Sequence, residues 1–118
     1  MVKLPWFKFY HHDWLSDPAL SACSQAARGF FIDLVCLMFD MPRRGVLFTQ
    51  DRPWTTKEAA AAVRGDPRTN AGHMRELLRL GVLKKNEKGE IHSARLVRDE
   101  SRREMEREKK RRQRVGNQ

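Results

Sequence analysis

Residues 54–95 carry, in order, the local signals for a short helix, a tight turn, a second helix and a two-stranded hairpin. Thr55 or Thr56 can cap the first helix, and Glu58 places a carboxylate in its first turn, where it complements the helix dipole. The residues that follow, 59–63, are small and permit close packing against another helix. This order of elements constrains the fold more than any other feature of the chain.

The turn and the second helix have clear boundary residues. Gly65 can adopt the left-handed conformation that stops a helix, Asp66 is a strong N-cap, and Pro67 fits the first helical position. We therefore predict a helix over residues 67–80, ended by a glycine. The residues expected on its core face are apolar: Ala71, Met74, Leu77, Leu78 and, as a further candidate, Leu80.

A β-hairpin is predicted next. Residues 82–85 and 90–92 form its strands and residues 86–89 its turn, in which Gly89 can hold a positive φ. A short strand over 45–48 is expected to pair with it. The prediction is therefore an α+β fold, a winged helix-turn-helix of three core helices plus a β-hairpin wing. Such a module usually places its second helix in the major groove of DNA.

The N-terminal third supplies another core helix. Ser24 can cap a helix over residues 24–41 that is apolar on more than one side. Two explanations are open. The preceding segment, with a predicted strand at 6–10 and turns at 13–15 and 17–20, wraps the helix, or part of the helix meets a partner subunit in a homodimer. The main apolar stripe consists of Ala27, Phe30, Phe31, Leu34, Val35 and Met38.

Charge is distributed unevenly along the chain, whose net charge is +9 and whose pI is about 10.3. Residues 1–40 hold three basic and four acidic residues, net −1, whereas residues 64–96 hold eight and four, net +4. Residues 97–118 hold nine and five, also net +4. We therefore predict a winged-helix domain over 1–97 and a basic charged helix or disordered arm over 98–118, with a polyanionic partner.

Candidate DNA-binding residues follow from this fold. On the helix over 67–80 we expect Arg68, Thr69, Asn70 and His73 to face base edges, and the helix N-terminus to bind a phosphate. Arg75 and Arg79 either join them or lie on the surface beside them. Further candidates for phosphate contacts are Thr55, Thr56 and Lys57 before and in the first helix, Lys84, Lys85 and Lys88 in the wing, and Arg107, Lys109, Lys110, Arg111, Arg112 and Arg114 in the tail.

Other classes of function find little in the sequence. The chain has no catalytic constellation and no phosphate-binding glycine loop, so we expect no enzyme activity and no cofactor. Adjacent His11 and His12 and the spacing of Cys23 and Cys36 do not form a metal-ligand pattern, so no metal is expected. With no secretory or membrane-spanning apolar run, we expect a cytoplasmic protein that does not enter a membrane.

The N-terminal pattern W-F-K-F-Y-H-H-D-W-L-S-D-P-A-L, followed by C-S-Q-A-A-R-G-F-F-I-D-L-V-C-L-M, resembles the N-terminal domain of phage and prophage replication proteins of the replisome-organiser or helicase-loader-associated type. The resemblance covers about residues 4–98, including G-V-L-K and A-R-L-V-R-D-E. It implies a winged-helix fold and binding at a replication origin. The matching residues are Trp6, Lys8, Tyr10, Asp13, Trp14, Leu15, Ala27, Arg28, Gly29, Asp33, Leu34 and Met38.

Two hypotheses of function result. The first is a non-enzymatic protein of phage type that binds double-stranded DNA sequence-specifically, in replication initiation or in transcriptional regulation. The second is a winged-helix adaptor that binds a host or phage replication or transcription protein through the Trp6 and Trp14 region and the surplus apolar face of the helix over 24–41. Replacement of Arg68, Asn70 and Arg79 by alanine distinguishes them, since only the first hypothesis requires those residues.

Overall fold

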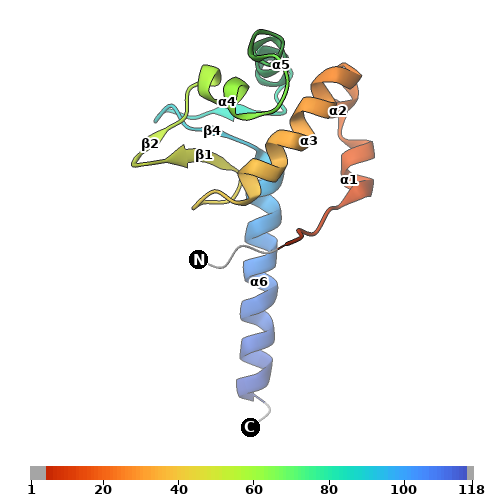
Figure 1. Ribbon diagram of the computed structural model, residues 1–118. Helices are drawn as coiled ribbons and strands as arrows, with labels where there is room; N and C mark the ends of the chain where they lie inside the picture. The colour runs from red at the N-terminus through yellow and green to blue at the C-terminus, as the bar shows by residue number, and fades with distance from the viewer. Residues whose placement is uncertain (1–4, 117–118) are drawn as a thin grey trace.

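Six helices and four short strands make up the fold of residues 5–116, the part of the chain that this computed structural model describes (Figure 1). The fold is mixed α+β and mostly helical. No helix among these residues is both long enough and apolar enough to cross a membrane. The elements in chain order are α1 (His11–Ser16), α2 (Pro18–Ala22), α3 (Gln25–Phe39), β1 (Val46–Thr49), β2 (Arg52–Pro53), α4 (Thr56–Ala62), α5 (Pro67–Arg79), β3 (Lys84–Lys85), β4 (Ile91–His92) and α6 (Ala94–Gly116).

The four strands form one antiparallel sheet in the order β2-β1-β4-β3. Strand β1 pairs with β4, with Val46 opposite His92 and Leu47 opposite Ile91, so the predicted pairing of this strand with the hairpin is confirmed. The hairpin itself is also confirmed, with Gly89 at φ +80° in its turn. Strand β2, which follows β1 after a tight turn, was not predicted. Gln50 and Asp51 in that turn both have positive φ.

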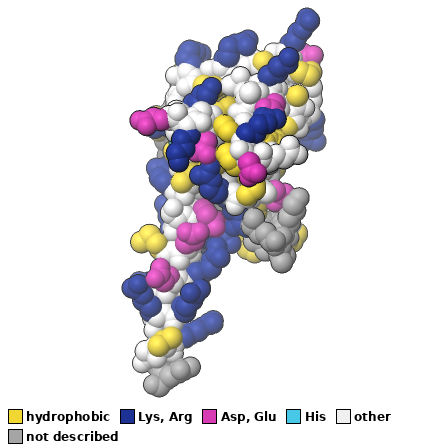
Figure 2. All heavy atoms as spheres, turned by 90° about the vertical axis from the view of Figure 1, so that its left-hand side faces the viewer, with side chains coloured by type: hydrophobic (Ala, Val, Ile, Leu, Met, Phe, Trp, Pro, Cys, Tyr) yellow, Lys and Arg dark blue, Asp and Glu magenta, His cyan; other side chains and the backbone are white. Residues whose placement is uncertain are grey.

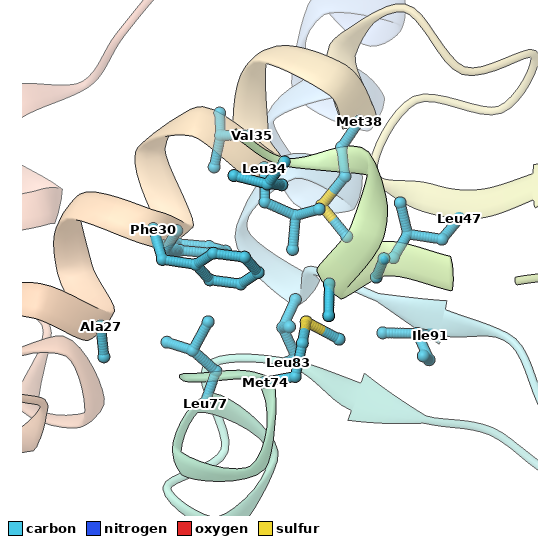
Figure 3. Packing of buried hydrophobic residues seen from close by; sticks show 14 of the residues in the cluster. Ala27, Phe30, Leu34, Val35, Met38, Leu47, Met74, Leu77, Leu83 and Ile91 are labelled. Carbon is cyan, nitrogen blue, oxygen red and sulfur yellow. The ribbon is translucent and has the colours of Figure 1, made fainter. Parts of the chain in front are cut away.

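The core lies between α3, α4, α5 and the sheet. Phe30, Leu34 and Met38 project from α3 toward Met74 and Leu77 of α5, and all five side chains are buried (Figure 3). The sheet and the segment that leads into it close the core, and their buried contributions are Leu47, Leu83 and Ile91. The predicted apolar stripe on α3 is therefore confirmed as core. Its helix begins after Ser24, whose hydroxyl accepts a hydrogen bond from the Ala27 N–H.

The segment before α3 differs from its prediction. Residues 6–10 form no strand, and the predicted turns at 13–15 and 17–20 are parts of α1 and α2. Two aromatic side chains of this segment pack onto α3: the rings of Phe7 and Phe39 lie 4.9 Å apart, and Trp14 stacks on Phe31 at 5.8 Å, whereas Trp6 and Phe9 are exposed. Asp17 caps α2. Wrapping within one chain is thus the explanation that the structure supports for the surplus apolar surface of α3.

The last helix begins beside the sheet and extends far beyond it (Figure 1). At its start, Leu96 is buried and the Ser93 N–H donates to the Gly45 carbonyl at 2.8 Å. The helix then continues through the predicted domain boundary at residues 97 and 98, so that boundary lies inside one element. Residues 104–116 are exposed in every case. Of the two predicted states of the tail, helix and disordered arm, the structure has the helix.

Gly45, the residue before β1, packs against the start of α6. Its conformation generates a prediction for stability. Its φ is +88°, and a Cβ at this position would lie 2.9 Å from the Leu96 Cβ and 3.1 Å from the Val97 backbone nitrogen. Gly81 also has a positive φ, +82°, but a Cβ there would meet no atom within 4 Å. We expect Gly81→Ala to lower the free energy of unfolding by about 1–2 kcal/mol, the cost of a side chain in the left-handed region. Gly45→Ala should cost clearly more, because α6 must also shift.

Urea denaturation of the two variants tests this prediction, with Gly81→Ala as the matched control for backbone strain alone. Equal losses in the two proteins would contradict the inferred packing of α6 against residue 45.

Candidate nucleic-acid interface

Three arginines form a stripe along the exposed face of α5. Arg68, Arg75 and Arg79 are exposed, and at 3.6 residues per turn the spacing of seven and eleven residues places them on one side of the helix. Gly72 lies on the same side, between them, and a Cβ at this position would lie 3.6 Å from the Arg75 guanidinium. At a rise of about 1.5 Å per residue the stripe is about 16 Å long. We name Arg68, Arg75 and Arg79 the arginine stripe.

The first turn of α5 is capped by its own carboxylate. The Asp66 side chain accepts hydrogen bonds from the Thr69 backbone N–H and from the Thr69 hydroxyl, both at 3.0 Å. Pro67 occupies the first helical position, as the sequence predicted. The carboxylate stands where we expected a phosphate, and its negative charge opposes an anion there. Thr69 therefore contributes to the capping of the helix, although it remains exposed.

The prediction that Asn70 faces base edges is wrong. Its side chain is buried, with 5% relative exposure, and the amide nitrogen donates to the carbonyl oxygens of Ala60, Val63 and Arg64 at 3.1, 3.0 and 3.3 Å. These carbonyls lie at the end of α4 and in the turn after it, so Asn70 satisfies acceptors that the helix leaves open. The spacing of residues 70, 74 and 77 shows why: Asn70 belongs to the same face as the buried Met74 and Leu77.

His73 and Glu76 lie on the side of α5 that faces α3, so His73 is also not on the arginine stripe. The His73 ring is half-buried, 5.7 Å from the ring of Phe30. The Glu76 carboxylate accepts hydrogen bonds from the Ser24 backbone N–H at 2.6 Å and from its hydroxyl at 3.2 Å. The bond from the Ser24 N–H lowers the pKa of Glu76. These contacts fix the rotation of α5 about its own axis, and that rotation turns the arginine stripe outward.

The start of α4 is held by a capping box. The Thr55 hydroxyl accepts from the Glu58 N–H, and the Glu58 carboxylate accepts from the Thr55 N–H, each at 3.1 Å. Arg52 donates to both oxygens of the same carboxylate at 2.7 and 2.8 Å, and these bonds lower the pKa of Glu58 to about 2. Of the three candidates here, the Thr55 hydroxyl is used internally, Thr56 is half-buried, and Lys57 is exposed.

The hairpin presents its predicted lysines to solvent. Lys84 and Lys85 lie on β3, an edge strand of the sheet, and consecutive strand residues point to opposite faces. Lys88 is in the turn, which Asn86 shapes by accepting from the Lys88 and Glu90 N–H groups at 3.0 and 2.9 Å. Hydrogen bonds from Asn86 and Arg43 lower the pKa of Glu90.

Ion pairing separates the basic residues of the body into two groups. Within residues 5–116, carboxylates neutralise several arginines outside the predicted site, among them Arg43, Arg52 and Arg64, which pair with Glu90, Glu58 and Asp33. The arginine stripe makes no ion pair with the described carboxylates, and neither do Lys57, Lys84, Lys85 or Lys88. Lys and Arg side chains crowd the end of the molecule that carries α5 (Figure 2). The field of that end is therefore set by unpaired positive charge.

The structure does not bring the tail candidates together with α5. Helix α6 extends away from the end of the molecule where α5 lies (Figure 1). Arg107 pairs with Glu100 at 3.5 Å and Arg112 with Glu108 at 3.1 Å. The remaining tail candidates, Lys109, Lys110, Arg111 and Arg114, are exposed with them on this distal part of the helix. The candidate residues thus form two separate basic surfaces.

No group of three or more histidine, cysteine or acidic side chains among the described residues could hold a metal ion. Comparison of the chain with protein-family models, with curated proteins and with solved structures found no match.

The burial of Asn70 predicts a difference between two neighbours on α5. Asn70→Ala should lower the free energy of unfolding by about 1–3 kcal/mol, because buried carbonyl groups at the end of α4 lose their donor. Arg68→Ala should change it by less than about 0.5 kcal/mol, since the side chain is exposed and unpaired. Urea denaturation of both variants measures this, and an equal effect of the two substitutions would contradict the assigned roles.

The depressed pKa of Glu58 gives a prediction for acid stability. Because the carboxylate titrates at about 2 in the folded chain, below its ordinary 4.5, its ionised form stabilises the fold above pH 4.5, and that contribution is lost as the pH falls through 2. We expect wild type to exceed Glu58→Gln in stability at neutral pH. The difference should shrink between pH 4.5 and pH 2. Thermal unfolding of both proteins over this range tests the prediction, and a constant difference would refute it.

Proposed function

We propose that this chain is a winged-helix protein that binds double-stranded DNA, with α5 in the major groove and the β3–β4 hairpin on the flanking backbone. The observation that carries the proposal is the arginine stripe: three exposed arginines on one face of the second helix of a helix–turn–helix, none of which pairs with a carboxylate of residues 5–116. Arginine forms bidentate hydrogen bonds with guanine in the major groove, and it also binds phosphate.

The arrangement of elements supports the winged-helix assignment. A core helix, α3, precedes a strand, β1; the pair α4 and α5 follows, joined by a tight turn; then comes the hairpin, whose second strand pairs with β1. The order β1-β4-β3 within the sheet is the one expected when the first strand of a winged helix joins the wing. The packing of α5 against both α3 and α4 places the second helix of the pair on the outside of a shared core.

The roles of individual residues are revised from those expected on sequence. Arg68, Arg75 and Arg79 are the proposed contacts of α5 with base edges and phosphates. Asn70 has a structural role. Lys57 at the start of α4 and Lys84, Lys85 and Lys88 in the hairpin are proposed to bind phosphate on either side of the groove, which would make binding strongly dependent on salt.

In the proposed function the protein acts by binding DNA and not by catalysis. The process it serves is replication initiation or transcriptional regulation, and the resemblance to phage replication proteins supports the first. Binding to repeated direct sites would favour an organiser of replication, and binding as a dimer to a palindrome would favour a repressor.

A second function, a protein-interaction adaptor, is supported by exposed apolar side chains on the N-terminal segment. Trp6 is 64% and Leu15 73% exposed, and Phe9, which lies between them in the sequence, is also exposed. Large apolar side chains in water are typical of surfaces that bind other proteins. The partner would be a replication or transcription protein, bound on a surface other than the arginine stripe.

Replacement of the arginine stripe tests the DNA-binding proposal. The triple variant Arg68→Ala/Arg75→Ala/Arg79→Ala should weaken duplex binding about 10-fold or more for each arginine removed, since each loses a base or phosphate contact. Fluorescence anisotropy with a genomic fragment and with random duplex, across a series of salt concentrations, measures the loss and the change in salt dependence.

The matched control removes three positive charges elsewhere. Lys8, Arg98 and Arg102 are exposed and belong to the N-terminal segment and to α6. Their replacement by alanine changes the net charge equally, and we expect a loss much smaller than that of the stripe variant. Equal losses of DNA affinity in the two variants would indicate that the protein attracts DNA only through its net charge and not through the arginine stripe. Absence of duplex binding by the wild type at low salt would refute the proposal and favour the adaptor.

A further inference from the structure

The distal part of α6 is a second basic surface that the proposed contacts on α5 leave unused. We name residues 104–116 the arm. All of them are exposed, and they continue as one helix from residues that pack against the body. Those packed residues include Leu96, which is buried, and Arg102, which lies 5.0 Å from the ring centre of Tyr10. The arm is therefore an extension of a helix whose base is anchored.

Positive charge is concentrated at the end of the arm. Residues 109–114 contain five basic residues and no acidic one. Among the described residues, only Arg112 of these five forms an ion pair, at 3.1 Å from Glu108. The acidic residues of the arm, at 104, 106 and 108, all precede this cluster. The five basic residues are Lys109, Lys110, Arg111, Arg112 and Arg114.

The composition of the arm favours a polyanion over a protein partner. Its only large apolar side chains are Met105 and Val115, ten positions apart, which is too few for the continuous apolar seam by which helices pair. Consecutive residues of a helix project about 100° apart, so the five basic side chains surround the helix axis. The major groove of a duplex, about 12 Å wide, admits a helix of this kind and places phosphates on both of its sides.

The direction of the arm separates it from α5. The molecule is 58 Å in its longest dimension, and α6, with 23 residues, spans about 34 Å. Figure 1 shows α5 at one end of the molecule and the end of α6 at the other. The proposed DNA contacts on α5 and the basic end of the arm therefore lie at opposite ends of the molecule.

We infer that the arm binds the phosphate backbone of a second segment of duplex DNA, so that one protein molecule bridges two duplexes. The inference rests on the proposed binding of DNA by α5. The arm acts independently of sequence, through charge, while α5 selects the first segment. A DNA-binding protein with this arrangement would hold together separate sites, or a site and a distant part of the same molecule.

A capture experiment tests the inference. One duplex is fixed to beads, the full chain is added, and a second, fluorescent duplex is supplied; the fluorescence retained on the beads reports bridging. The five basic residues of the arm are replaced together by glutamine, which keeps a good helix former at each position. We expect this variant to lose capture by about 10-fold or more, while its affinity for a single duplex changes only a few-fold, because the first site is intact.

A variant that removes the acidic residues of the arm, and so changes its charge in the opposite direction, serves as the matched control. Glu104→Gln/Glu106→Gln/Glu108→Gln makes the arm more basic, and we expect it to raise capture and to extend it to higher salt. Sedimentation of the wild type without DNA establishes the number of copies that act together. If the variant without the five basic residues still captures the second duplex, and sedimentation shows a dimer with one α5 for each duplex, the inference is overturned.

The remaining outcomes separate the inference from the function on which it rests. If the wild type binds one duplex but captures no second one, the arm does not bridge and the DNA-binding proposal stands. If the arm variant loses single-duplex affinity and capture to the same extent, the arm lies on the same duplex as α5, and the inference is wrong. If the wild type binds no duplex at all, the DNA-binding proposal itself fails.

Discussion

The hydrogen bonds from the Asn70 amide to three backbone carbonyls are the constraint on which the arrangement of α4 and α5 depends. A helix of seven residues such as α4 leaves its last carbonyls without partners in the helix, and the turn after it is too short to provide them. Asn70 supplies the donors from the next helix at 3.0–3.3 Å. A single buried side chain thus links the end of α4 and the turn after it to α5.

This constraint also determines which side of α5 meets solvent. With Asn70, Met74 and Leu77 inward, rotation of the helix would leave the buried Asn70 amide and its carbonyl partners unsatisfied, and it would also break the exposed hydrogen bonds between Glu76 and Ser24. The exposed face is therefore the one that carries Arg68, Arg75 and Arg79. The proposed binding surface is the face of α5 opposite the core, so the packing that buries one face also exposes the other.

Electrostatics reinforces this division. Arginines outside the proposed surface are held by carboxylates that lie far away in sequence, as Arg64 is by Asp33 and Arg43 by Glu90. Such exposed pairs add little stability, but they remove positive charge from the surfaces where they lie. Unpaired positive charge is left on the arginine stripe, on the hairpin and on the arm. Because α6 extends away from α5, this charge faces two directions, and the inference of a second duplex follows from that separation.

Much of the local structure could be predicted from the sequence. The caps at Ser24 and Asp66, the apolar stripe of α3 and the glycine in the hairpin turn all act over a few residues, and each lies where it was expected. For α4 the sequence left Thr55 and Thr56 open as caps, and the structure has Thr55. The α+β class and the pairing of β1 with the hairpin were also predicted correctly. Even the burial of Asn70 could have been predicted from the sequence. Its spacing of four and seven residues to Met74 and Leu77 places it on the buried face of the helix, although asparagine is a residue type typical of DNA contacts.

Other features were decided only by the tertiary structure. The segment 6–10 is β-prone by composition, yet it forms no strand: Phe7 packs on Phe39 of α3, Trp6 and Phe9 remain exposed, and no strand among the described residues pairs with the segment. The direction of α6 depends on the contact of Leu96 and Val97 with Gly45, about fifty residues earlier. Local sequence determines where a helix begins and what its faces carry, since those interactions span one or two turns. Which face is buried, and where a helix points, depends on contacts between residues that only the folded chain brings together.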